Sequence, residues 1–406
     1  MTPVMSESQV LKKRIEELDI MKGIGIIVIA VYHIVYRSMD GIADKLVRSW
    51  GWAFIGVFFL LSGYTCRQTK RVRESYKRRV LGLVLPVIIV EFLLLFFGGL
   101  YCIFMHDYSV KSVLYDALVT FLRPEITTRI SSQWGEGGIL FFNLSPVWFI
   151  WSMAWTELFF HPLRLLIVGK GEKVWLLLLT GLIAIQVPMY VFLPPASWGL
   201  TVIPTYLIFM LMGAKLREWD AVSRLMKIKP PAALGISILG LAAQFGCFLF
   251  DGNESYYVSI LGDYGMQARN AGVHDMMSAI DIPVVLLQLL CFLPAIFFIA
   301  RVLVKIPVVS RGLVWMGQHT LAILLLHCIL AVVYSDIFKN YIKPGSYWYL
   351  ELNDIELTSE IVLKSILCCI LALITCIPLI LIWEKLKDML FAAIARRKEA
   401  KIAKNN

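Results

Sequence analysis

The sequence predicts an all-α integral membrane protein, built as a bundle of about ten transmembrane helices. Of its 406 residues, 59% are hydrophobic and only 17% are charged. Soluble domains contain about 45–50% apolar residues, so this composition is typical of a membrane protein. The apolar residues also form long uninterrupted stretches, and the cations between these stretches are unevenly distributed. Composition, stretch length and charge distribution therefore predict the same fold class.

A helix needs about 17–25 apolar residues to cross a bilayer core. The expected spans, in order, are residues 20–37, 50–66, 80–105, 139–160, 174–194, 200–216, 231–250, 282–303, 313–335 and 361–383. The polar segments between them are too short for a separate soluble domain. We therefore expect a cytoplasmic N-terminal segment over 1–19, a transmembrane domain over 20–383 and a basic cytoplasmic tail over 384–406.

The lysines and arginines predict an orientation with both termini in the cytoplasm. In that topology 29 of the 39 cations lie in or at the edge of inner segments, and 10 lie outside. This is the bias that the positive-inside rule requires. The net charge of +10 is then a topological signal, so we expect no nucleic-acid partner.

The first span places a cation and an imidazole on one helix face. Lys22 and His33 are eleven residues apart, which is three turns plus about 20° and a rise of about 16 Å. With Lys22 at one interface, His33 would lie near the middle of the bilayer. Ionisable groups at that depth are costly, and a functional role is their default interpretation.

The second span ends in the run Phe-Phe-Leu-Leu-Ser-Gly-Tyr over 58–64, followed by a basic loop over 67–79. Gly63 permits a close backbone approach, and Ser62 can form a hydrogen bond inside the bundle. The loop could bind phosphate groups, anchor the topology or contact anionic lipids. These alternatives remain open at the level of the residues.

Two carboxylates and a late histidine lie inside other spans. Glu91 and Glu157 need partners, which Lys22, two arginines of the basic loop or His33 could supply. The ninth span reads Gly-Gln-His-Thr-Leu from residue 317 and reaches His327. None of the six histidines has metal-ligand spacing to another, so we expect no metal site.

Together these motifs resemble the membrane acyltransferase-3 family, and more narrowly its polysaccharide and fucose O-acetyltransferase-like branch. The resemblance covers nearly the whole chain. It rests on Asp19-x-x-Lys22, on the Lys22-to-His33 spacing, on the run 58–64, on the Arg-Arg…Pro start of the third span and on the late Gly-x-x-Thr-Leu…His. The usual first-helix cation of the family is arginine, and lysine lacks its bidentate fork.

The resemblance implies a membrane-embedded O-acyltransferase that moves an acetyl group from cytoplasmic acetyl-CoA to a hydroxyl of a cell-surface or exopolysaccharide sugar. His33 would be the general base or acyl relay, supported by Lys22 and Asp19. The expected residues for the CoA donor are Arg78, Arg79, Ser62 and Lys22, and those for the acceptor are Trp148, Glu157 and His327. Acetyl-CoA would be a co-substrate, with no permanently bound cofactor.

The expected location is a bacterial plasma membrane, as a multi-pass protein in contact with lipid. A homodimer is compatible with this class. The first alternative is a transporter or flippase for a polysaccharide precursor or small solute, for which intramembrane charges such as Glu91 and Glu157 would line a path. The second is a membrane sensor or scaffold that has kept the fold and lost the chemistry.

Overall fold

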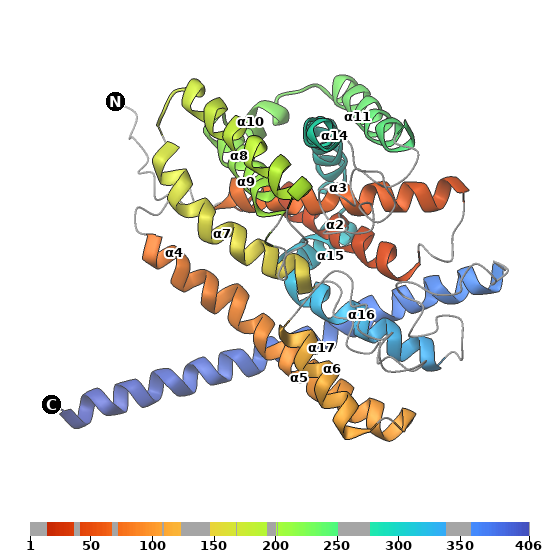
Figure 1. The fold of residues 1–406 in the computed structure, drawn as a ribbon, viewed down its shortest axis with the longest axis vertical. Coiled ribbons are helices and arrows are strands. Elements are labelled where there is room, and N and C mark those ends of the chain that lie inside the picture. The colour runs from red at the N-terminus through yellow and green to blue at the C-terminus, as the bar shows by residue number, and fades with distance from the viewer. Residues whose placement is uncertain are drawn as a thin grey trace.

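The computed structural model describes residues 14–35, 41–66, 72–107, 109–122, 147–167, 169–192, 200, 202–250, 277–337 and 359–405. Every secondary-structure element in these ranges is a helix (Figure 1). They are α2 (Glu16–Ile34), α3 (Gly41–Thr65), α4 (Val72–Arg79), the π-helical turn η2 (Val80–Val84), α5 (Leu85–His106), α6 (Val110–Leu122), α7 (Val147–Ile167), α8 (Glu172–Phe192), α9 (Ile203–Glu218), α10 (Ala221–Met226), α11 (Pro230–Phe250), α14 (Met277–Leu303), α15 (Pro307–Gln318), α16 (Thr320–Ile337) and α17 (Ser359–Asn405). The all-helical prediction is confirmed for this part of the chain.

A helix covers at least part of each of the ten stretches that the sequence marks as spans. By length and composition, four helices in the described ranges are able to cross a membrane, or five if the bent pair α15–α16 is one span. The four candidate segments are Lys45–Thr65, Val80–Phe97, Leu286–Leu303 and Val362–Leu386. The number of about ten spans and the inward orientation of both termini stay predictions.

The ninth expected span, 313–335, is not one continuous helix. The helix begins earlier, at Pro307, and is broken at His319, where α15 and α16 meet at an angle of 78°. The Nδ1 atom of His319 lies 2.7 Å from the backbone oxygen of Trp315, and its Nε2 atom lies 2.9 Å from Oε1 of Glu384 in α17. The imidazole of His319 therefore contacts both its own helix and α17 at the break. The bend thus coincides with a side-chain contact to α17 that hydropathy does not register.

The C-terminal helix continues through the boundary expected at residue 383. Helix α17 has 47 residues and runs to Asn405, so the described part of the segment 384–406 extends the last expected span as helix. Figure 1 shows its C-terminal end projecting away from the other helices.

Helix α2 lies at the centre of the bundle and contacts α3, α14, α15, α16 and α17 (Figure 1). Its contact with α15 is a backbone contact made possible by glycine. A Cβ built on Gly23 would lie 2.2 Å from the backbone oxygen of Leu313, and one built on Gly317 would lie 1.9 Å from that of Asp19. The polar N-terminal turn of α2 is thus fixed against α15.

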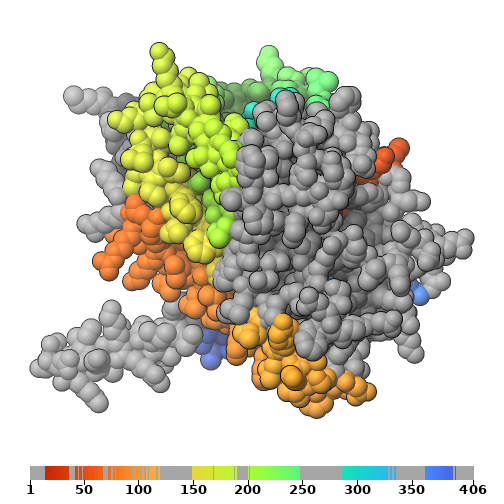
Figure 2. All heavy atoms as spheres, viewed as in Figure 1, coloured from red at the N-terminus to blue at the C-terminus, as the bar shows by residue number. Residues whose placement is uncertain are grey.

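Helices α4 to α8 line one side of the face shown in Figure 2. Large apolar side chains are exposed along α5 and α8, including Phe92, Phe97 and Phe104 on α5 and Leu176 and Leu177 on α8. Exposed apolar area on this scale is typical of helices that face lipid. It agrees with a multi-pass membrane protein.

Candidate functional site

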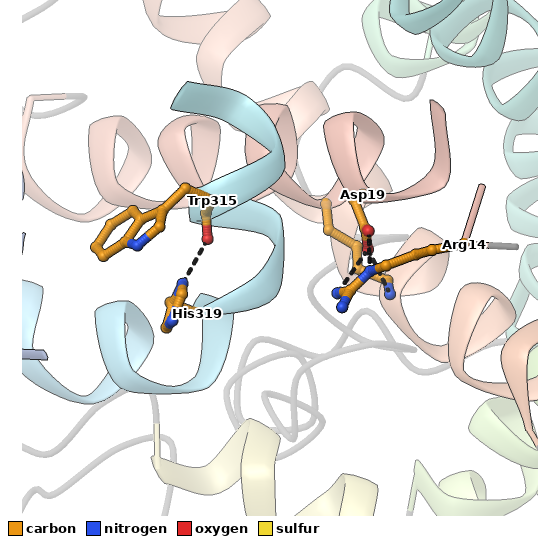
Figure 3. A network of polar contacts seen from close by, with 5 residues as sticks. Arg14, Asp19, Trp315 and His319 are labelled. Atoms are coloured by element: carbon orange, nitrogen blue, oxygen red, sulfur yellow. Dashed lines mark hydrogen bonds and ion pairs between the residues drawn. The ribbon is translucent and has the colours of Figure 1, made fainter. Parts of the chain in front are cut away.

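The first turns of α2 carry a cluster of charges around one carboxylate. Asp19 is 3% exposed, and its Oδ1 atom lies 3.6 Å from Nζ of Lys22, one turn along the helix. Arg14 forms a second ion pair with the same carboxylate, and in Figure 3 it points toward Asp19. Asp19 and Lys22, both expected at the site, are therefore paired. Arg14 is a partner that the family motif did not indicate.

The second cluster lies between the end of α3, the end of α4 and the middle of α7. Ser62 donates from Oγ to Oε1 of Glu157 over 3.0 Å, and Nε of Arg79 lies 2.5 Å from Oε2 of the same carboxylate. Glu157 is 1% exposed, so the arginine supplies the cation that a buried carboxylate requires. Arg79 was among the partners expected for Glu157. The structure thus joins three of the predicted site residues.

The two clusters are neighbours. The charges of Lys22 and Arg79 lie near enough to repel each other, although each is paired with its own carboxylate. Lys22 and Asp19 from α2 and Ser62, Glu157 and Arg79 from the other helices therefore belong to one charged region. Five of the predicted residues meet here.

Further cations extend this region beyond the residues predicted from the motifs. Arg164 donates to the Sγ atom of Cys66 over 3.5 Å, and Nδ1 of His161 lies 3.9 Å from the same sulfur. Arg217 of α9 donates to the backbone oxygens of Cys66 and Tyr64, at 2.7 and 3.3 Å. The signal was available in the sequence, because Glu157, His161 and Arg164 follow the i, i+4, i+7 spacing of one helix face.

The first turns of α2 and the end of α3 are surrounded by both cations and carboxylates among the described side chains. Asp19 and Glu157 are each paired with a cation, and the first turn of α2 adds the carboxylates of Glu16 and Glu17. Arg164 and Arg217 bond neutral groups, a sulfur and two backbone oxygens, and arginine suits phosphate oxygens through paired hydrogen bonds.

His33 lies at the other end of α2, and the structure does not bring it to Lys22. Instead, its Nδ1 atom is 2.9 Å from Nε2 of His327 in α16, with the rings stacked at a centroid distance of 5.2 Å. His327 is completely buried, whereas His33 is only partly buried. The expected acceptor residue His327 is therefore a direct partner of the expected base.

Three further predictions concern the partner of Glu91, the roles of Arg78 and Trp148, and metal binding. Glu91 has no ion pair within the described ranges and lies buried beside Trp151. The side chains of Arg78 and Trp148 fall outside the described residues. In the part of the chain that the structure describes, no group of three or more His, Cys, Asp or Glu side chains could hold a metal ion.

The ion pair of Glu157 gives a testable prediction about stability. Replacing Arg79 by methionine leaves a buried carboxylate without its cation, and we expect a loss of about 2 kcal/mol in the free energy of unfolding. This is below the usual cost for a fully buried pair, because the Arg79 side chain is 39% exposed. Denaturant unfolding of the purified protein in detergent measures the change.

The matched control is Arg73→Met, which removes an exposed arginine from the same helix. The double variant Arg79→Met/Glu157→Gln should recover part of the loss, since it leaves no buried charge. Equal stabilities of Arg79→Met and Arg73→Met would contradict the assignment.

Comparison with known proteins identifies a family for this chain. The profile of the acyltransferase-3 family, described as an acyltransferase domain, matches residues 15–383, which covers α2 through the apolar part of α17. No curated protein and no solved structure shows a significant match. The matched region contains the histidine pair and both charged clusters except Arg14. It also contains the candidate membrane spans, apart from the last few residues of the fourth. The chain therefore belongs to the acyltransferase-3 family of membrane acyltransferases.

Proposed function

We propose that this acyltransferase moves an acetyl group from cytoplasmic acetyl-CoA to a hydroxyl group of a cell-surface or exopolysaccharide sugar. The observation that carries the proposal is the layout of α2. The charged region lies at the start of this helix. His33, whose Nδ1 atom is hydrogen-bonded to His327, lies eleven residues after Lys22. Eleven residues rise about 16 Å, so the two groups can serve different parts of one extended donor.

The cations of the charged region would bind the phosphate groups of CoA. Lys22, Arg79 and Arg164 present positive charge, and Ser62 adds a hydroxyl. The phosphates would bind here and the extended pantetheine arm would direct the thioester toward His33. The lysine at position 22 contributes a point charge, and the neighbouring arginines supply the forked donors that lysine lacks. The positive-inside bias predicts that this end of α2 faces the cytoplasm, where CoA is found.

The chemistry requires activation of the acceptor, because a sugar hydroxyl is a poor nucleophile. An unprotonated nitrogen of His33 would accept the hydroxyl proton while the oxygen attacks the thioester carbonyl. The C–O bond forms, the C–S bond breaks, and the imidazolium then protonates the departing CoA thiolate. In a covalent route, Nε2 of His33 would attack the thioester carbonyl, the N–C bond would form and the C–S bond would break to release CoA thiolate. The sugar hydroxyl would then attack the acetylimidazolium, the N–C bond would break, and the hydroxyl proton would neutralise the thiolate.

A transfer assay tests this function. The purified protein is given acetyl-CoA with and without a panel of candidate sugars and polysaccharide fragments, and free CoA and product mass are followed. We expect CoA release that depends on the sugar and a product that is heavier by one acetyl group. A transporter or flippase would instead move a solute across proteoliposomes without any need for acetyl-CoA. CoA-independent transport without acetylation would overturn the proposal.

A further inference from the structure

The hydrogen-bonding partners of His327 determine which of its nitrogens carries a proton. Its Nδ1 atom lies 2.9 Å from the backbone oxygen of Ile323, one turn earlier in α16. A carbonyl oxygen can only accept, so Nδ1 of His327 must donate its hydrogen there. In the neutral ring the other nitrogen, Nε2, then has a lone pair and can only accept.

The position of the proton on His327 determines the position of the proton on His33. Nε2 of His327 is 2.9 Å from Nδ1 of His33, and because the former accepts, the latter must donate. The proton of neutral His33 is therefore on Nδ1, and the lone pair is on Nε2. No described residue forms a hydrogen bond with Nε2 of His33. The ring thus presents an unprotonated nitrogen on the side away from His327.

We propose that His327 is the positioning residue of His33, fixing the tautomer and the ring plane that make Nε2 of His33 the base. This inference rests on the proposed function, in which His33 takes the hydroxyl proton. It assigns His327 a role other than contact with the acceptor sugar. His327 acts through His33 and does not touch the reacting atoms.

The surroundings of the pair support a fixed geometry. The chain of hydrogen bonds ends on a backbone carbonyl inside α16, which cannot rotate as a side chain would. The two ring planes are 25° apart, and Ala30 and Ala331, each about one turn from one of the histidines, belong to one buried apolar cluster. Orientation of a catalytic imidazole through its second nitrogen is also how the aspartate of hydrolase triads works.

The pair remains hydrogen-bonded when His33 is protonated. After Nε2 of His33 accepts the hydroxyl proton, its Nδ1–H still donates to His327. The bond then becomes charge-assisted, and it stabilises the imidazolium without placing a negative charge in the bundle. No proton needs to move between the two histidines. The bond becomes stronger during the step, which is a property of a transition-state contact.

Two substitutions of His327 separate this role from a general packing role. His327→Leu fills the space and removes the acceptor, so we expect kcat to fall by about 10²–10³-fold with little change in the KM for acetyl-CoA. His327→Gln keeps an acceptor oxygen near the position of Nε2 and should retain kcat within about tenfold of the wild type. Tyr334→Phe is the control in the same helix and should leave kcat unchanged, because it removes only a hydroxyl that is hydrogen-bonded to Thr375 of α17. Thermal unfolding checks that all three proteins are folded.

The kinetic outcomes distinguish this inference from the function on which it rests. Wild-type activity in folded His327→Leu, with an inactive His33→Ala, would overturn the role of His327 and leave the proposed function standing. A changed KM for the acceptor with an unchanged kcat would also overturn the inference, and it would support the expected role of His327 in binding the acceptor. Wild-type protein with no transfer to any acceptor would instead count against the proposed function.

A spectroscopic measurement tests the proton assignment without activity. Nitrogen-15 solid-state NMR of histidine-labelled protein distinguishes protonated from unprotonated ring nitrogens. The His33 signals are identified by their loss in His33→Ala. We expect a protonated Nδ1 and an unprotonated Nε2 on His33 in the wild type, and a mixture of both tautomers in His327→Leu. A wild-type His33 protonated on Nε2 alone would overturn the inference.

Discussion

Replacement of His33 by alanine is expected to lower the kcat of acyl transfer by between about 10²-fold and 10⁴-fold, the usual contribution of a general base. The KM for acetyl-CoA should change little, because the charged region that would bind CoA lies three turns away on α2. Steady-state kinetics with acetyl-CoA and the best acceptor measure both constants. Tyr334→Phe again provides a control, since its hydroxyl is hydrogen-bonded to Thr375 of α17.

Mass spectrometry of the wild-type protein separates the two chemical routes. With acetyl-CoA and no acceptor, a covalent route would leave an acetyl group on the wild-type peptide that contains His33, and mass spectrometry of a rapidly quenched sample would detect it. The direct route leaves that peptide unmodified. A folded His33→Ala protein that transfers acetyl groups at the wild-type rate would exclude both routes.

The helices and several local contacts could be predicted from the sequence, because they depend on nearby residues. An apolar stretch of about 20 residues forms a helix wherever it is placed in a bilayer, since its backbone groups have no other partners there. The close approach at Gly63 and the hydrogen-bonding role of Ser62 are properties of those residues within a helix interface. The partner of Glu157, Arg79, was one of the basic residues that the sequence offered for it.

The histidine pair could not be predicted, because it depends on how distant helices pack. His33 and His327 are separated by 294 residues, and no spacing rule connects them. Each lies in an apolar helix where a buried imidazole satisfied by the backbone is an ordinary finding. Only the packing of α2 against α16 brings the rings within hydrogen-bonding distance.

The break at His319 could not be predicted from hydropathy, for a different reason. Hydropathy is averaged over a window, and residues 313–335 average to one apolar segment. The bend coincides instead with two contacts of a single imidazole, one to the backbone of Trp315 and one to Glu384. Figure 3 shows the first of these, with His319 pointing toward the Trp315 backbone.

The second large effect is expected at the contact between α3 and α9. A Cβ built on Gly63 would lie 1.9 Å from the backbone oxygen of Met210, and one built on Gly213 would lie 1.9 Å from that of Leu60. The obstacle in each case is backbone, so no side chain can move aside and the helices must separate. We therefore expect Gly63→Ala and Gly213→Ala each to lower the free energy of unfolding by about 3 kcal/mol or more, at the upper end for overpacked interiors.

Separation of these helices would also affect the charged region. Arg217 of α9 bonds the backbone oxygens at the end of α3, and Ser62 precedes Gly63 on the same helix. The alanine variants should therefore lose acyl transfer together with stability. Gly181→Ala in α8 and Gly235→Ala in α11 are matched controls, because a Cβ at either position meets nothing within 4 Å. Both should be neutral or more stable by up to about 1 kcal/mol, since alanine favours helix. Thermal unfolding in detergent ranks the four variants, and a Gly63→Ala protein as stable as Gly181→Ala would show that α3 and α9 do not pack backbone to backbone.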